Sequence, residues 1–387
     1  MHSEFMYPDT VQTSEQMDHS DSAGTPGEHS LETTIEDFLE SGNKSGNYRD
    51  ALERVLTQWR HRLEQRSIET VDEIDKRTMA TYAQYLSRRV DAGTSRNVDG
   101  GIAAATAWTY YDYVSAFLSY CVRWDYLEEN PAQKGIALDE LPPRPTKKSG
   151  DQQFWSAADR TALCRYVDDR AHQAVDERGT DAFEELRDRA LVYVLAYSGV
   201  RGGEILADPR DDRRSGLRWQ DVDLENNQLK ILGKNQQFEE AQLPVQCHGP
   251  LERLEKALDP PTPAWPVFVT SHAPSLYGAL PDEGDPSAGD PLELCRDYGV
   301  TPPSLSTNGG RSVLKRLCED AKLDVDGDYL KPHGARRGVG EAVYRERGPA
   351  AAQRTLRHAD PRTTSQMYAH IEASELAEDV GDVFENE

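Results

Sequence analysis

Three separated segments of the chain concentrate arginine, histidine and tyrosine, the side chains that bind anions, transfer protons or act as nucleophiles. The first segment, 197–206, reads YSGVRGGEIL. Its Arg201 and Glu204 are three residues apart, about one helical turn, and they follow Gly199, a residue type common at helix ends. We expect this spacing to hold the Arg201 guanidinium rigidly against the Glu204 carboxylate.

The second segment, 331–337, reads KPHGARR. Pro332 is suited to the first position of a helix, because a proline there has no hydrogen bond to lose. A helix that begins at Pro332 places His333 and Arg336 on one face, since residues three apart are neighbours on a helix surface. We therefore expect an imidazole and a guanidinium side by side.

The third segment, 356–370, reads LRHADPRTTSQMYAH. Thr363 and Gln366 have the spacing of a capping box, in which each residue satisfies a backbone N–H at the start of a helix. This pattern predicts a short helix that begins near Thr363 and carries Tyr368.

In this order, the three segments resemble the arginine–glutamate box, the His-x-x-Arg box and the terminal Leu-Gly-His…Tyr-x-His box of the tyrosine recombinases, the family of phage integrases. The resemblance covers roughly residues 31–371. The family's hairpin lysine corresponds to Lys234, which stands on a Gly-Lys turn. The sequence departs from the family at Arg357, where glycine is usual, at Arg337, where histidine is common, and at 235–242, where NQQFEEAQ replaces a basic arm.

The resemblance implies site-specific DNA strand exchange through a 3′-phosphotyrosine, without ATP, metal or other cofactor. The tyrosine hydroxyl would attack a phosphodiester, the two arginines would bind its non-bridging oxygens, and the histidines would donate to the phosphate, with His333 also able to accept the tyrosine proton. The lysine would protonate the departing 5′ oxygen. The catalytic residues implied are Tyr368, Arg201, Lys234, His333, Arg336 and His358.

Other interpretations exist for each residue and for the whole chain. Singly, Tyr368 could be a packing tyrosine, His333 a surface imidazole, and Arg201 a structural partner of Glu204. A type IB topoisomerase uses the same chemistry, but the small N-terminal helical segment favours a recombinase. A DNA-binding regulator that lost the chemistry is the third possibility, and the retention of every reacting group argues against it.

Apolar residues at helical spacing and a short strand-like alternation predict a mainly helical protein with a small antiparallel β-sheet. The resemblance further implies that a helical core-binding (SAM-like) domain precedes a mixed α+β catalytic domain. We predict a disordered acidic tail at 1–30, an N-terminal helical DNA-binding domain at 31–133, a Pro-rich linker at 134–150, a catalytic domain at 151–371 and an acidic tail at 372–387. Asn130-Pro131 is expected to end the last N-terminal helix. The predicted sheet lies between residues 222 and 245, and 259–306 is expected to be an irregular insertion.

Taken alone, the net charge of −24 argues against a double-stranded DNA partner, because DNA-binding proteins are usually basic. Residues 1–43 hold ten acidic and no basic residues, and 372–387 hold seven and none, so the tails carry 17 of the 24 charges. The body between them is only mildly acidic. Together with an excess of arginine over lysine, this pattern is typical of a halophile's hydrated acidic surface.

The sequence contains no apolar run near the ~20 residues that a bilayer crossing needs. Its five cysteines are widely spread, without the spacing of a zinc site or a disulfide framework, as is typical of a reducing cytoplasm. We expect a cytoplasmic protein that is not associated with a membrane. The resemblance further implies a homotetramer on DNA, in which the segment after the tyrosine docks on a neighbouring subunit.

Overall fold

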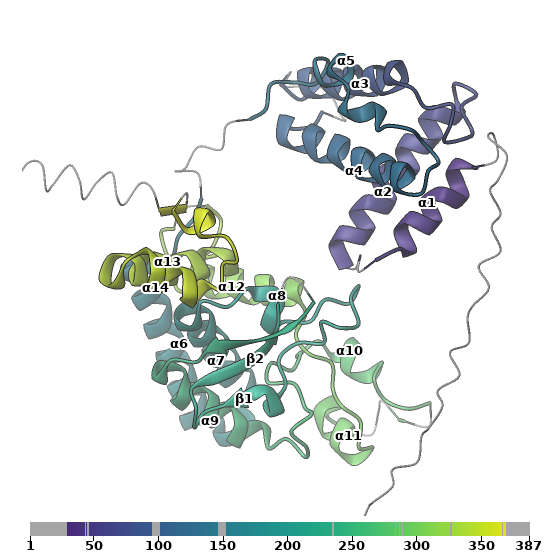
Figure 1. Cartoon of the computed structure of the whole chain (residues 1–387). Coiled ribbons are helices and arrows are strands. Elements are labelled where there is room, and N and C mark those ends of the chain that lie inside the picture. The colour runs from purple at the N-terminus through teal and green to yellow at the C-terminus, as the bar shows by residue number, and fades with distance from the viewer. Residues whose placement is uncertain are drawn as a thin grey trace, which may run out of the picture. The chain divides into compact units, whose positions relative to one another are not determined.

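The computed structural model describes residues 29–42, 44, 46–94, 101–145, 152–233, 236–282, 284, 285, 287, 289–325, 327–365, 367 and 368. The chain forms two compact units, Met1–Gly42 with Ala51–Pro145 and Asn43–Asp50 with Thr146–Glu387. It is mainly helical with one small antiparallel sheet, as predicted (Figure 1). The predicted tail at 372–387, and nearly all of the one at 1–30, lie outside the described residues.

The N-terminal unit is a helical bundle. Its main helices are α1 (Leu31–Glu40), α2 (Gly46–Glu64), α3 (Lys76–Thr94) and α4 (Ala104–Arg123). The apolar stripes that predicted them face inward, and their residues, such as Leu56, Trp59 and Phe117, are almost fully buried. Trp59 and Phe117 meet edge to face at a centroid distance of 5.9 Å, a favourable arrangement of two aromatic quadrupoles.

The last of these helices ends earlier than predicted. α4 stops at Arg123, seven residues before Asn130, because the chain turns sharply at Asp125, whose φ of 57° is in the left-handed region. Asn130 instead begins a single 3₁₀ turn, η1 (Pro131–Gln133), and its side chain accepts a hydrogen bond from the Ala132 N–H at 2.9 Å. Asn130-Pro131 therefore marks a turn and not the end of a long helix.

The described part of the predicted linker packs on the N-terminal unit. A short helix, α5 (Gly135–Leu138), opens it. The indole Nε1 of Trp108 then donates to the Pro142 carbonyl at 2.9 Å, and the Arg144 guanidinium lies 4.0 Å from the Trp108 ring. These contacts extend the N-terminal unit through Pro145, so 134–145 is not the extended chain that its prolines suggested.

The C-terminal unit begins with a capping box. The Ser156 side chain accepts from the Asp159 N–H, and Asp159 accepts from the Ser156 N–H, at the start of α6 (Ala157–Arg178). The next helix, α7 (Phe183–Ser198), lies in the centre of the core and packs against α6, α9 (His248–Leu258) and α13 (Pro332–Arg347). It ends at Gly199, whose φ of 68° favours glycine.

The predicted sheet is present and has three antiparallel strands in sequence order. They are β1 (Val222–Asp223), β2 (Gln228–Leu232) and β3 (Phe238–Gln242). Leu229 pairs with Ala241 and Ile231 with Glu239, so the buried face of β2 alternates with its exposed face as expected. The β2–β3 hairpin therefore places its turn at one end of this small sheet.

The predicted irregular insertion at 259–306 is wrong in part. The run Trp265-Pro266-Val267-Phe268-Val269 is buried in the core, and Val269 forms a bridge with Ser304. Two short helices follow, α10 (Ala273–Tyr277) and α11 (Pro291–Asp297). Tertiary packing of five consecutive largely apolar residues outweighs the turn-forming composition around them.

The last helices carry two of the three segments noted above. After α12 (Thr307–Asp320) come α13 and α14 (Pro349–Leu356), which lie side by side in Figure 1. The helical turns that carry Tyr368 begin at residue 361, two residues before the predicted start, because Asp360 and not Thr363 caps them; its Oδ1 accepts from the Arg362 N–H at 2.9 Å. No helix in the described part of the chain is long and apolar enough to cross a bilayer.

Candidate active site

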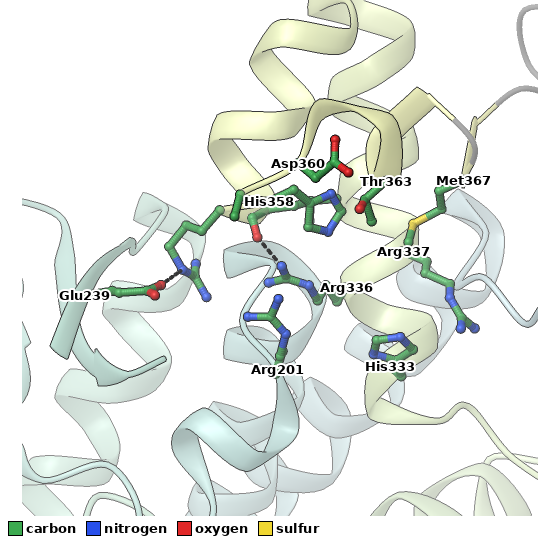
Figure 2. A pocket seen from close by; sticks show the side chains of 12 residues that line it. Arg201, Glu239, His333, Arg336, Arg337, His358, Asp360, Thr363 and Met367 are labelled. Atoms are coloured by element: carbon green, nitrogen blue, oxygen red, sulfur yellow. Dashed lines mark hydrogen bonds and ion pairs between the residues drawn. The ribbon is translucent and has the colours of Figure 1, made fainter. Parts of the chain in front are cut away.

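A cavity of about 820 Å³ opens between the end of α7, strand β3, helix α13 and the segment after α14. Four of the six predicted catalytic residues line it: Arg201, His333, Arg336 and His358. In Figure 2 the guanidinium groups of Arg201 and Arg336 lie close together, with His358 above them. The structure therefore brings together residues from all three sequence segments.

Arg201 is held as its spacing predicts. It follows Gly199 and precedes the short helix α8 (Gly202–Ile205), and its Nη1 donates to Glu204 Oε1 at 2.7 Å. The Arg201 backbone N–H donates to Glu204 Oε2, also at 2.7 Å. The Glu204 side chain is almost fully buried, whereas 30% of the Arg201 side chain remains exposed. One face of this guanidinium is thus anchored and the rest is open to the cavity.

Arg336 projects from α13 and is only 3% exposed. Its Nη1 donates to the Gly199 carbonyl at 2.5 Å, and its Nη2 donates to the Leu356 carbonyl. The same side chain therefore joins the C-terminal ends of α7 and α14. Burial, and then the nearby Arg201, lower the pKa of Arg336. A guanidinium is still protonated at neutral pH, so Arg201 and Arg336 both present a positive charge to the cavity.

The two histidines are neutral at neutral pH in the free protein. Burial and the cations Arg337 and Arg336 lower the pKa of His333 to about 4. Burial, with Arg336 and Arg201, lowers the pKa of His358 to about 4 as well. Nδ1 of His358 lies 2.9 Å from Thr364 Oγ1, which orients the ring. An unprotonated imidazole can accept a proton, and an anion bound between the arginines will raise both pKa values.

Tyr368 does not line this cavity, although its neighbour Met367 does. Its side chain is fully buried, and its hydroxyl donates to the Arg337 carbonyl at 3.2 Å. The ring packs against Tyr344 and Phe154. Burial raises the pKa of the Tyr368 hydroxyl. The predicted nucleophile is therefore adjacent in sequence to a residue that lines the cavity, but its hydroxyl is buried outside that lining and bonded to the Arg337 carbonyl.

The sixth predicted residue, Lys234, lies outside the described residues. The hairpin that carries it is present, since β2 and β3 pair from Gln228 to Leu232. Lys230, on β2, is a nearby lysine, but its Nζ lies 5.0 Å from the centroid of the Phe238 ring and the residue does not line the cavity.

Four further charged residues line the cavity: Glu239, Arg337, Arg357 and Asp360. Arg357 is visible in the sequence only as a departure from the family pattern. Glu239 carries no sequence signal, because its place follows from the pairing of β3 with β2.

The comparisons with known proteins give a consistent result. No family model matches the chain. Tyrosine recombinase XerC of Corynebacterium glutamicum is 25% identical over 316 residues, 80% of this chain and 79% of that protein. XerC of Vibrio vulnificus is 21% identical over 319 residues, 78% of this chain and 81% of that protein. XerC of Xanthomonas axonopodis pv. citri is 28% identical over 199 residues, 51% of each chain.

Solved structures show the same fold. The Tn1549 transposon integrase in complex with transposon right end DNA superposes with a TM-score of 0.56 at 15% identity, covering 90% of this chain and 99% of that one. The XerH site-specific recombinase bound to palindromic difH substrate gives a TM-score of 0.55 at 16% identity, covering 92% and 84%. In sequence the chain is therefore similar to XerC tyrosine recombinases, and it shares its fold with these integrase and recombinase structures.

Proposed function

We propose that this protein is a site-specific DNA recombinase whose nucleophile is Tyr368. The observation that carries this proposal is the convergence of Arg201, His333, Arg336 and His358 on one cavity beside the helix of Tyr368. Two fixed guanidiniums suit the two non-bridging oxygens of a phosphodiester, because each can donate paired hydrogen bonds to developing negative charge.

The reaction balances with groups of this chain and the DNA alone. The Tyr368 oxygen forms a bond to phosphorus while the bond from phosphorus to the 5′ oxygen breaks. The tyrosine proton passes to His333, which is unprotonated at neutral pH, and Lys234 donates a proton to the leaving 5′ oxygen. The 3′-phosphotyrosine stores the energy of the broken bond. A 5′-hydroxyl of another strand then reverses the steps, so neither ATP nor a metal takes part.

This mechanism requires Tyr368 to move. Its hydroxyl donates to the Arg337 carbonyl and is buried among aromatic rings, where a raised pKa makes it a poor nucleophile. The hydroxyl has to leave that position and enter the cavity that Met367 already lines. Entry between two arginines lowers the pKa of a tyrosine, because nearby cations favour the phenolate.

The partner we propose is double-stranded DNA, bound by both the helical domain (31–133) and the catalytic domain (151–371). The DNA complexes of the Tn1549 integrase and XerH support it. We further propose that four copies assemble on DNA in the cytoplasm and that 372–387, outside the described residues, couples neighbouring subunits. Deletion of 373–387 should then slow strand exchange more than cleavage, and exchange at the full-length rate would refute the coupling.

The test of the proposed function uses a supercoiled plasmid that carries DNA fragments from the neighbourhood of the gene. The reaction is stopped with detergent, and DNA attached to protein is captured and sequenced. A recombinase gives 3′-linked protein, free 5′-hydroxyl ends and recombined plasmids. Relaxed plasmid without recombinants would support a topoisomerase, and DNA binding without any adduct would support a regulator that lacks the chemistry.

A further inference from the structure

Arg357 has a backbone conformation that favours glycine. It ends α14 with φ 52° and ψ 47°, in the left-handed region where a side chain is disfavoured. An arginine held in such a conformation beside a functional cavity points to a use for its side chain. The side chain lines the cavity and is only 11% exposed.

The guanidinium of Arg357 lies between two carboxylates from other parts of the fold. Its Nη2 donates to Glu204 Oε2 at 2.6 Å. Its Nε lies 3.3 Å from Oε2 of Glu239, which is on β3. Arg357 therefore links the helix end before His358 to the Arg201 segment and to the sheet.

Glu204 is shared by two cations. Its Oε1 accepts from Arg201 Nη1 at 2.7 Å, and its Oε2 accepts from Arg357. Because one negative charge is divided between two guanidiniums, positive charge remains on Arg201 for an anion in the cavity. Without Arg357, the buried Glu204 carboxylate would pair with Arg201 alone and would cancel more of its charge.

The Glu239 carboxylate places a second negative charge near the phosphate site. It lines the cavity, and 33% of its side chain is exposed. An uncompensated carboxylate at this wall would repel the phosphate that the arginines attract, and the repulsion would be strong because the surroundings are partly buried. The ion pair with Arg357 offsets this charge. One guanidinium thus compensates both carboxylates.

We propose that Arg357 is a positioning residue for the cleavage step, one that shares the Glu204 carboxylate with Arg201 and neutralises Glu239. This inference rests on the proposed function. Because the family usually has glycine at this position, the proposed role of Arg357 is particular to this chain. It predicts that the harm from losing Arg357 comes largely from the Glu239 charge and can be reduced by removing that charge.

The test compares single-turnover cleavage of a nicked DNA substrate by the full-length protein and five variants. R357G removes the side chain and also relieves the left-handed strain, so it should fold. R357K restores one charge but cannot span both carboxylates. E239Q and R357G/E239Q complete a double-mutant cycle, and R354Q is the control, since Arg354 is an exposed arginine of the same helix. DNA affinity and the unfolding midpoint are measured for each variant.

We expect R357G to cleave at least about tenfold more slowly, with DNA affinity changed by less than about threefold. R357K should recover part of the rate, and R357G/E239Q should be at least about threefold faster than R357G. R354Q should match the wild type. The proposal is overturned if R357G cleaves at the wild-type rate, if R354Q is equally slow, or if the double variant is no faster than R357G. Absence of a covalent adduct with the wild-type protein would instead refute the proposed function.

Discussion

At the residue scale, Arg336 combines a structural and a chemical function in one guanidinium. Its fork donates to the carbonyls of Gly199 and Leu356 while the group faces the cavity. Lysine keeps the charge but cannot make this pair of bonds. We predict that Arg336→Lys slows cleavage by about a hundredfold or more and changes DNA affinity little, because phosphate contacts elsewhere dominate binding.

The matched control is Arg345→Lys on the same helix. Arg345 is exposed and pairs with Glu341 one turn away, an interaction of little energetic value. Single-turnover rates and equilibrium binding are compared for the two variants. Equal cleavage by Arg336→Lys and the wild type would exclude Arg336 from the reaction.

The lowered pKa values of His333 and His358 predict how the stability of the fold depends on pH. His333 and His358 have a pKa of about 4 in the folded protein, below the ordinary value of ~6.5 in an unfolded chain. Because the pKa is lower in the folded state, the unfolded state binds protons first as pH falls. The contribution of the two histidines to the free energy of unfolding is therefore complete above pH ~6.5 and is lost from there down to pH ~4. Because both rings are partly exposed, we expect the free energy of unfolding to fall by about 1 kcal/mol per ring between pH 7 and pH 5.

Chemical unfolding of the wild type and of His358→Gln at pH 7 and pH 5 measures this effect. The variant should lose less stability on acidification than the wild type does. Equal losses would show that His358 is not held neutral by its surroundings. Carboxylates that titrate in the same range are common to both proteins and cancel in the difference.

At the element scale, α13 holds Tyr368 away from the cavity. A Cβ on Gly340 would lie 2.0 Å from the Tyr368 hydroxyl oxygen and 2.6 Å from Leu356 Cδ1, so only glycine leaves room for the tyrosine there. We predict that Gly340→Ala displaces the hydroxyl and raises the reactivity of Tyr368 toward nitration by about tenfold, with some loss of stability from overpacking.

Mass spectrometry of the nitrated peptides measures the extent of nitration at each tyrosine separately. Tyr111, which is buried in the N-terminal unit, is the internal control and should stay protected in both proteins. If Tyr368 is equally protected in Gly340→Ala, then Gly340 does not determine its position.

Local spacing predicted those features that depend on neighbours in sequence. The Arg201–Glu204 pair and the helix beginning at Pro332 both form as expected. Features that depend on distant partners were not predictable. The buried position of Tyr368 needs Phe154 and Tyr344, which no spacing connects to it.

The same distinction explains the errors in the elements. The burial of 265–269 and the packing of 135–144 on Trp108 are tertiary contacts that outweigh local turn-forming or proline-rich composition. The helical turns that carry Tyr368 begin at residue 361 because Asp360 is a better cap than the threonine three residues later. The set of residues that share the cavity was predictable only through the family resemblance.

At the scale of the whole molecule, the net charge of −24 predicts an unusual dependence of DNA binding on salt. Each phosphate neutralised by lysine or arginine normally contributes about −0.9 to the slope of log K against log salt concentration. If the acidic surface reflects a cytoplasm rich in potassium, binding relies less on such contacts. We predict a slope shallower than about −5 between 0.2 and 2 M KCl, and a steeper slope would argue against a halophilic origin.

We propose that Tyr368 forms the covalent bond to DNA. Wild-type protein and Tyr368→Phe are incubated with cleavable DNA under identical conditions, denatured, digested with nuclease and trypsin, and the peptides are analysed by mass spectrometry. The account predicts a nucleotide attached to Tyr368 in the wild type, no attached nucleotide in Tyr368→Phe, and DNA affinity almost equal in the two proteins. An adduct formed by Tyr368→Phe, or a nucleotide found on any other residue, would contradict it.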